Sequence, residues 1–251
     1  MISIKNDIQQ TGIRKSAELL GRVFSRIGES VSPGMTTKDI DRIVEETIRG
    51  SGGVPAFLGY GGFPASVCAS VNDRVIHGIP NDDPLEEGDI VGCDIGVILD
   101  GYYSDACKTF TVGTADEKTR KLLEVTRASL EAAIAVCGPG GRIKDIGRAV
   151  TDTVSPYGYG IVYSYCGHGV GLALHEDPQI PNYHPSRGPN PRMKPGMVLA
   201  IEPMLNAGVP EVEVLDDGWT VVTADGSLSA HFEHTVLITE DGADVLTHWG
   251  E

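Results

Sequence analysis

The segment from residue 89 to residue 112 constrains the fold most strongly, because its pattern is that of one long β-hairpin. Two runs rich in apolar residues, Asp89 to Leu99 and Tyr102 to Val112, flank an Asp100-Gly101 pair. Asp-Gly is typical of the two-residue turn that joins antiparallel strands. The sequence therefore predicts a hairpin in which the residues that flank the turn face each other, which fixes the register of the two strands.

This register places two aspartates on one face of the hairpin. Counting outward from the turn puts Asp94 opposite Cys107, and Asp105 lies two residues from Cys107 on the same face. Asp94 and Asp105 are then diagonal neighbours, with β-carbons roughly 7 Å apart. Two unpaired carboxylates on a half-buried face repel each other, and a cation between them would remove that repulsion. An exposed face with solvated acids would also account for the pair.

Two pairs of helices alternate with groups of strands along the rest of the chain. Apolar residues at helical spacing predict the helices, and two of these follow capping-box patterns. The first helix carries Leu19, Leu20, Val23 and Ile27, and the second carries Ile40, Ile43, Val44 and Ile48 behind the box at Thr36 to Asp39. The third opens at a box formed by Thr114 to Glu117 and ends near Gly138, and the fourth spans residues 143–154. Further strands are expected at Ser66 to Val71, Ile161 to Tyr165, Met197 to Glu202, Trp219 to Thr223 and Phe232 to Thr239. This order predicts an α+β fold of two similar halves, packed as one domain over residues 1–251.

Composition excludes several classes of function. The 20 Lys and Arg against 35 Asp and Glu give a formal net charge of -15, whereas a nucleic-acid partner requires a basic face. The five cysteines are odd in number and form no CxxC pair, which is typical of reduced thiols rather than of disulfides or a zinc knuckle. The sequence has no basic-then-apolar leader and no apolar run of membrane-spanning length. We therefore expect a cytoplasmic protein with no nucleic-acid or membrane partner.

The second half of the chain supplies three more candidate metal ligands. His168 stands in a Gly-His-Gly-Val-Gly segment that we expect to be a turn, where small neighbours allow close approach to a ligand. Glu202 ends an apolar run typical of a buried strand, and Glu233 comes just before another. Each residue alone has a simpler interpretation, as a surface histidine or a solvated acid. Together with Asp94 and Asp105, they are four carboxylates and one imidazole, which suit two divalent metal ions and a hydrolytic water.

Several motifs in order resemble those of one family. The motifs are VIHGIP at 75–80, Asp94 with Asp105 eleven residues later, GHGVG at 167–171, IEP at 201–203 and FEHT at 232–235. They resemble the type I methionine aminopeptidases, within peptidase family M24 and the pita-bread metallohydrolases. The resemblance extends from the first helix to the last strand, and five dispersed motifs are far more specific than one short pattern.

The resemblance implies a pita-bread fold, with two pseudo-symmetric αβ halves around a central cleft that holds two divalent metal ions. It assigns Asp94 as a chelating ligand of one ion, Asp105 and Glu233 as bridging carboxylates, and His168 and Glu202 as ligands of the other. Oxygen ligands and one imidazole suit Co, Mn, Fe or Zn, and the ions would activate a water that attacks the scissile carbonyl. Glu202 is the family's candidate for accepting the proton.

The resemblance also implies a substrate site beside the metals. His77 and His175 would contact the substrate backbone and support the tetrahedral intermediate, whereas His184, His234 and His248 would have no such role. An apolar pocket for the methionine side chain would be lined by Phe57, Tyr60, Phe63, Cys68, Leu174 and Trp219. Some positions depart from the family's common residues, namely Phe57, Phe63, Leu174 and His231. The pocket stays apolar despite these changes, so we expect methionine preference with an altered pocket shape.

The expected activity is removal of the initiator methionine from nascent polypeptides when the second residue is small. We expect a monomer that contacts the ribosome at most transiently. One alternative is an X-Pro aminopeptidase or prolidase of the same fold, because Leu172 to Glu176 looks similar to those sequences. Such enzymes usually carry an additional N-terminal domain not found here, and Asp217 to Thr220 with Cys68 favours the methionine branch. A second alternative is a non-catalytic binding protein of this fold, but such relatives lose ligands and all five are present.

Overall fold

The first two helices begin at the caps that their sequences provide. The structure is a computed structural model and describes residues 1–250. Helix α1, Asp7–Ser30, and helix α2, Thr37–Gly50, each start with a capping box, at Asn6 and Thr36 respectively. In the second box the side chain of Thr36 accepts from the Asp39 N–H, as the spacing predicts. The predicted apolar stripes are buried in both helices, apart from the half-buried Ile43.

The third helix starts two residues later than its sequence pattern predicts. Helix α3 spans Glu117–Ala135, and its N-cap is Asp116, whose side chain accepts from the Thr119 N–H at 2.7 Å. The prediction of a box opening at Thr114 is therefore wrong. The Thr114 N–H donates instead to Glu87 Oε1 at 2.7 Å, which holds this residue in the segment that leaves the hairpin. Helix α4, Ile143–Val154, has the predicted bounds.

The strands of the described residues form four sheets. The first half contributes β1 Val54–Pro55, β2 Cys68–Val71, β3 Arg74–Ile76, β4 Ile90–Leu99 and β5 Tyr102–Thr111, with a short 3-10 helix at Tyr60–Gly62. The second half contributes β6 Gly160–Ile161, β7 Gly167–Gly169, β8 Glu176–Ile180, β9 Val198–Ile201, β10 Met204–Asn206, β11 Val212–Val214, β12 Val221–Thr223, β13 Ser229–His231, β14 His234–Ile238 and β15 Ala243–Val245. The two largest sheets have the order β1-β4-β2, with β5 on β4, and β15-β14-β9-β7-β8.

The β4–β5 hairpin has the predicted register. Leu99 pairs with Tyr102 across the turn, and Asp94 pairs with Cys107. Asp105 is only 3% exposed, so the face that carries the two aspartates is buried rather than solvated. A solvated hairpin face is thereby excluded as the reason for this pair of acids.

His168 lies in strand β7, where the sequence pattern predicts a turn. The strand runs between β8 and β9, and His168 pairs with Ala200 of β9. A β-carbon on Gly167 would lie 2.3 Å from the Ala200 carbonyl oxygen, and one on Gly169 would lie 2.3 Å from the Asp177 carbonyl oxygen. The two glycines therefore serve close packing of three strands rather than a change of chain direction.

The two large sheets meet beside the hairpin face. Cys107 of β5 and Glu233 form an isolated bridge, in which the Glu233 N–H donates to the Cys107 carbonyl at 2.9 Å. Two residues further along each of these two segments, the Thr235 hydroxyl donates to the Asp105 carbonyl and accepts from the Asp105 N–H. These bonds bring the second half of the chain against the carboxylates of the first.

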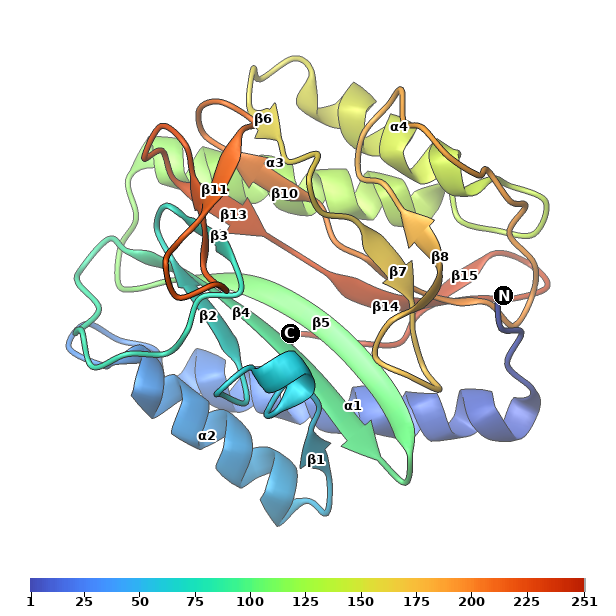
Figure 1. The fold of residues 1–251 in the computed structure, drawn as a ribbon, viewed down its shortest axis with the longest axis horizontal. Helices are drawn as coiled ribbons and strands as arrows, with labels where there is room; N and C mark the ends of the chain where they lie inside the picture. Colours follow the sequence, from blue (N-terminus) through green and yellow to red (C-terminus); the bar gives the residue numbers. More distant parts are fainter. Residues whose placement is uncertain (251) are drawn as a thin grey trace.

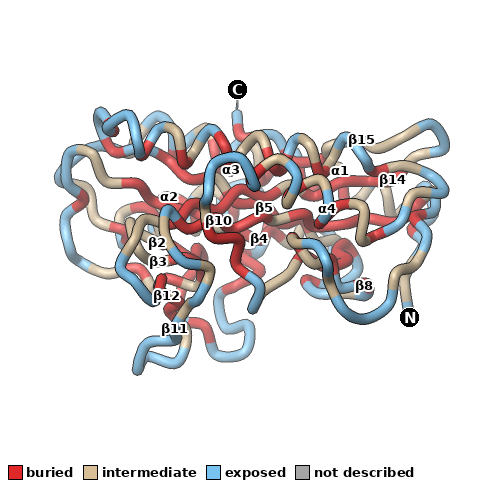
Figure 2. Tube along the Cα trace, turned by 90° about the horizontal axis from the view of Figure 1, so that it is seen from above, coloured by how far each residue is buried: buried red, intermediate tan, exposed pale blue. Residues whose placement is uncertain are grey.

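Helices and projecting strands lie on opposite sides of this junction. Figure 1 shows α1 and α2 beside the hairpin half and α3 and α4 beside the other half. Figure 2 shows β11 and β8 on the side away from α1 and α3, with buried residues along the middle of the molecule. The largest hydrophobic cluster contains side chains from all four helices, such as Leu20, Ile40, Leu130 and Val150. No helix within residues 1–250 is both long and apolar enough to cross a membrane.

Candidate active site

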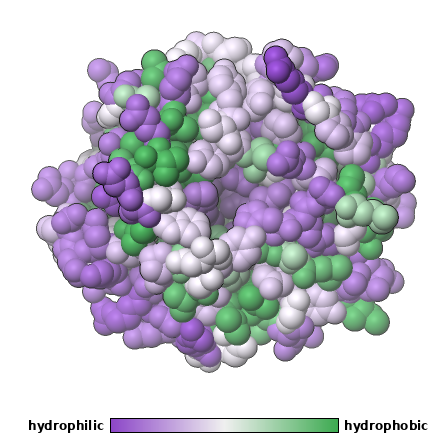
Figure 3. Space-filling model, in the orientation of Figure 1, coloured by the Kyte–Doolittle hydropathy of each residue, from purple (hydrophilic) through white to green (hydrophobic). Residues whose placement is uncertain are grey.

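One cavity of about 180 Å³ brings together every residue proposed from the sequence as a ligand, catalytic group or pocket wall. Its lining consists of Phe57, Tyr60, Phe63, Cys68, His77, Asp94, Asp105, His168, Leu174, His175, Glu202, Trp219 and Glu233. Figure 3 shows that this face of the molecule is hollowed near its middle. The structure therefore establishes that these residues are neighbours, while their individual roles stay predictions.

The five candidate ligands come from five strands or strand ends and converge at one end of the cavity. His168 Nε2 lies 3.6 Å from Glu202 Oε1 and 3.9 Å from Asp105 Oδ2. One possible ligand atom each of Asp105, His168 and Glu233 lie within 4.8 Å of one another. Asp94 extends the group from β4, across the hairpin from β5.

Three of these carboxylates have an oxygen that no protein group satisfies. Asp94 Oδ1, Asp105 Oδ1 and Glu233 Oε1 are buried and have no hydrogen-bond partner. No lysine or arginine is among the described residues that line the cavity. Buried carboxylate oxygens without donors are costly unless a cation occupies the space between them. The donor set of hard oxygens and one imidazole therefore fits divalent metal ions.

The imidazole of His168 is oriented to offer a lone pair to this group. His168 Nδ1 lies 2.9 Å from the Gly169 carbonyl oxygen, which can only accept, so Nδ1 carries the proton. Burial lowers the pKa of His168 to about 4, so the ring is neutral at pH 7 and Nε2 is unprotonated. A neutral imidazole fixed through its other nitrogen is the usual form of a metal-ligating histidine.

Burial and mutual repulsion disfavour the charged forms of the four carboxylates in the metal-free protein. Desolvation raises the pKa of Asp94 to about 7. It raises the pKa values of Asp105, Glu202 and Glu233 well above normal, and the neighbouring carboxylates raise them further. Bound cations would reverse this effect by favouring the ionised carboxylates.

We expect the thermal stability of the metal-free protein to fall as the pH rises above about 6.5. The four folded carboxyls keep protons that the unfolded chain has already released above about pH 4, so rising pH favours unfolding. The buried histidines, with lowered pKa values, oppose this trend only below about pH 6.5. Melting curves in chelator across this pH range measure the effect. A loss of the same size in protein saturated with a divalent ion would show that these carboxyls are not its source.

Another part of the cavity wall is apolar. Phe57, Phe63, Cys68 and Leu174 belong to one buried cluster, against which Trp219 packs. The rings of Phe63 and Trp219 meet edge to face with centroids 5.2 Å apart. Aromatic walls and one thiol form a surface suited to a long, unbranched apolar side chain.

Two more histidines stand between the acidic and the apolar ends. His175 Nδ1 lies 2.8 Å from the Tyr60 hydroxyl, and the His175 ring centroid is 4.3 Å from that of His168. His77 has a left-handed backbone, with φ of 56°, and its ring meets those of Tyr165 and Trp219 edge on. Burial lowers the pKa values of both histidines, so both are neutral at pH 7. Each can therefore donate one N–H toward a bound molecule.

His231 belongs to this environment although the sequence pattern identified it only as an unusual residue. Its Nε2 is buried without a hydrogen-bond partner and lies 3.7 Å from Glu202 Oε2. Strand alternation could have indicated this place, because residues 231 and 233 face the same side when the chain is extended. The other histidines do not line the cavity, and His234 instead contacts the Thr247 hydroxyl at 3.0 Å.

Comparison with known proteins identifies the family. The model of metallopeptidase family M24 matches residues 11–240. This chain is a member of family M24. An M24 relative, the methionine aminopeptidase of Treponema pallidum, is 49% identical over 247 residues, which are 98% of this chain and 96% of that protein.

Solved M24 structures confirm the α+β pita-bread fold. The methionine aminopeptidase of Rickettsia prowazekii superposes with a TM-score of 0.96 at 39% identity, and the match covers 99% of this chain and 100% of that one. The prolidase of Pyrococcus furiosus superposes less closely, with a TM-score of 0.77 at 27% identity, over 98% of this chain and 65% of that one. Within family M24, this chain is thus more similar to the methionine aminopeptidases than to that prolidase.

Proposed function

We propose that this chain is a dinuclear metallo-aminopeptidase that removes an N-terminal methionine when the second residue is small. The observation that carries the proposal is the single cavity with a cluster of carboxylates and an imidazole at one end and a pocket of aromatic and aliphatic side chains at the other. An amino terminus at the acidic end would be attracted by the carboxylates, and its side chain would enter the apolar end. Relatives of the same family that carry the name methionine aminopeptidase support this substrate.

The five ligands would hold two divalent ions, of Co, Mn, Fe or Zn. The residues that would hold these ions are Asp94, Asp105, His168, Glu202 and Glu233, which line the same cavity. Bound ions would polarise the scissile carbonyl and lower the pKa of a water molecule at the site. The chain itself provides the rigid frame, because each ligand lies in or directly beside a hydrogen-bonded strand.

Glu202, His77 and His175 would supply the proton transfer and the hydrogen bonds of the reaction. The side chain of Glu202 is 12% exposed and desolvation raises its pKa, which makes the ionised carboxylate a better proton acceptor. If the Tyr60 hydroxyl donates to His175 Nδ1, the proton of His175 stands on Nε2 and can be donated to a developing oxyanion. His77 would bind the substrate backbone from the other wall.

Nascent polypeptide N-termini would be the natural substrates of such an enzyme. We propose that it works in the cytoplasm as a monomer and that any ribosome contact is transient. We also propose that residues 1–251 form one catalytic domain, which is supported by the hydrophobic cluster shared among all four helices.

Metal removal and peptide choice test this function together. Protein treated with a chelator should lose hydrolysis of a Met-Ala-Ser peptide and regain it when Co, Mn, Fe or Zn ions are supplied one at a time. A dipeptide with proline in the second position and a residue other than methionine in the first should not be cut. Cleavage of that dipeptide with no cleavage of Met-Ala-Ser would instead indicate a prolidase. Inactivity on both substrates with every ion would indicate a binding protein that has the fold alone.

A further inference from the structure

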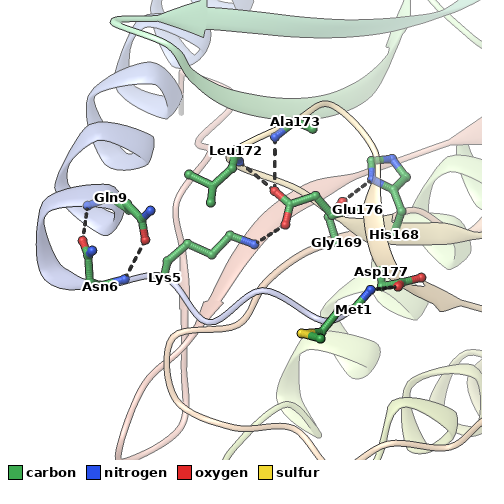
Figure 4. A network of polar contacts seen from close by, with 10 residues as sticks. All are labelled: Met1, Lys5, Asn6, Gln9, His168, Gly169, Leu172, Ala173, Glu176 and Asp177. Carbon is green, nitrogen blue, oxygen red and sulfur yellow. Dashed lines mark hydrogen bonds and ion pairs between the residues drawn. The ribbon is translucent and has the colours of Figure 1, made fainter.

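The Glu176 carboxylate, at the start of β8, links the N-terminal segment to a loop of the substrate site. Lys5 Nζ donates to Glu176 Oε2 at 2.8 Å. The other oxygen, Oε1, accepts the N–H groups of Leu172 at 2.7 Å and Ala173 at 3.2 Å. Figure 4 shows these contacts side by side, with His168 beyond them. One side chain thus joins residue 5 to residues 172–173.

Lys5 is a fixed point in this linkage. Its side chain is 1% exposed and that of Glu176 is 11% exposed, so the ion pair is shielded from water. The Lys5 backbone is also bonded on both sides: its N–H donates to the Gly196 carbonyl, and its carbonyl accepts from Gln10 Nε2, both at 2.8 Å. A buried ion pair anchored in this way holds its geometry more firmly than an exposed one.

The loop that Glu176 holds carries two residues of the site. Residues 171–175 form bends rather than strand, and they include Leu174 of the apolar pocket and His175. The Gly171 carbonyl accepts from the Tyr103 N–H at 2.9 Å, but the next two N–H groups go to the Glu176 side chain. The Glu176 side chain therefore accepts two backbone N–H groups that no strand ladder takes.

We propose that Lys5 and Glu176 are positioning residues that set the place of Leu174 and His175 in the substrate site. Neither residue lines the 180 Å³ cavity, although Glu176 lines an adjoining pocket that shares His168 and His175 with it. The hydrogen bonds from Leu172 and Ala173 connect Glu176 to the loop. The effect on turnover rests on the proposed function, whereas the effect on the loop does not. The donors around the Glu176 carboxylate determine which substitutions should disturb the position of the loop.

Replacing Glu176 with Gln separates the two halves of the linkage. A glutamine has one acceptor oxygen and one NH₂ donor, but it would face donors on both sides, the Lys5 ammonium and the two loop N–H groups. Glu176→Gln should lower kcat on Met-Ala-Ser about ten- to a hundredfold with KM changing less, because misplaced catalytic groups cost rate. Amide exchange at Leu172 and Ala173 should become faster at a temperature far below the melting point. Adding Lys5→Met to this variant should restore most of kcat and most of the slow amide exchange. In the double variant the glutamine NH₂ faces an apolar side chain and its oxygen faces the loop.

The matched control is Arg14→Met. Arg14 also joins the N-terminal region to a distant carboxylate, Asp244, at 2.6 Å, but this pair is exposed and forms no hydrogen bond with the described loop residues 171–175. Arg14→Met should leave kcat and the amide exchange of the loop unchanged.

Unchanged kcat and unchanged amide exchange in folded Glu176→Gln would overturn the proposal. A double variant with slower turnover than the single variant would also overturn it. If the single variant does not fold, the double variant decides alone, with near-normal exchange expected and faster loop exchange overturning the proposal. Wild-type inactivity on Met-Ala-Ser would refute the proposed function, while the exchange data would still test the linkage.

Discussion

Asp94→Asn should lower kcat/KM on a Met-Ala-Ser peptide by a factor of about 10³ or more. Metal ions contribute several kcal/mol to the stabilisation of such a transition state, and about 4 kcal/mol corresponds to this factor. Asn keeps the size of the side chain but removes the charge that would bind a cation. Asp94 Oδ1 accepts no hydrogen bond from the protein, so replacing this oxygen with the NH₂ group of Asn breaks no hydrogen bond at that position.

The same substitution should raise the melting temperature of the metal-free protein at pH 8. The pKa of Asp94 is raised to about 7 by burial, so its ionised form is unfavourable in the folded state and a neutral amide removes that cost. Damage to the fold would change activity and stability in the same direction, whereas loss of a ligand changes them in opposite directions. Melting curves in chelator at pH 8 and a peptide assay measure the two effects, and calorimetric metal titration measures the loss of metal affinity.

Asp100→Asn is the matched control for this experiment. Asp100 stands at the turn of the same hairpin with φ of 50°, a conformation that Asn tolerates. It does not line the cavity, so activity and metal affinity should remain at the wild-type level. Full turnover by Asp94→Asn with an intact fold would contradict the metal site proposed above.

His175→Ala should lower kcat by about 10²- to 10⁴-fold while KM changes much less. A neutral histidine that donates to a developing oxyanion acts mainly in the transition state, and removing such a donor costs about this much. Tyr60→Phe should give a smaller loss of the same kind, because the Tyr60 hydroxyl contacts His175 Nδ1 and would act by orienting the ring. Steady-state kinetics on Met-Ala-Ser separates kcat from KM.

His184→Ala provides the comparison for His175→Ala. His184 is a histidine of the same half that does not line the cavity, and its substitution should leave kcat unchanged. Equal losses in the two variants would point to a general effect of histidine removal on the fold. A large rise in KM with normal kcat in His175→Ala would assign this residue to substrate binding alone.

Local patterns were sufficient for the helices and for the register of the hairpin, whereas the resemblance to a known family proposed the catalytic and pocket residues. The Asp100-Gly101 turn determined the register that places Asp94 opposite Cys107, and the cap at Thr36 and the bounds of α4 followed from side-chain chemistry close in sequence. Predictions failed where a distant group competed for the backbone. Glu87 takes the N–H of Thr114, and the strands β8 and β9 make the segment around His168 a strand.

The sequence by itself therefore proposed the residues of the site, through ligand types and strand positions for the candidate ligands and through resemblance to a known family for the rest. Only the tertiary structure decided how they meet. It placed His231 Nε2 at 3.7 Å from Glu202 and left three carboxylate oxygens buried without donors. It also connected Lys5 to the loop of His175 through Glu176, a link between residues 171 positions apart. Such contacts depend on the packing of two halves of the chain, and no local periodicity encodes the distance between groups that only folding brings together.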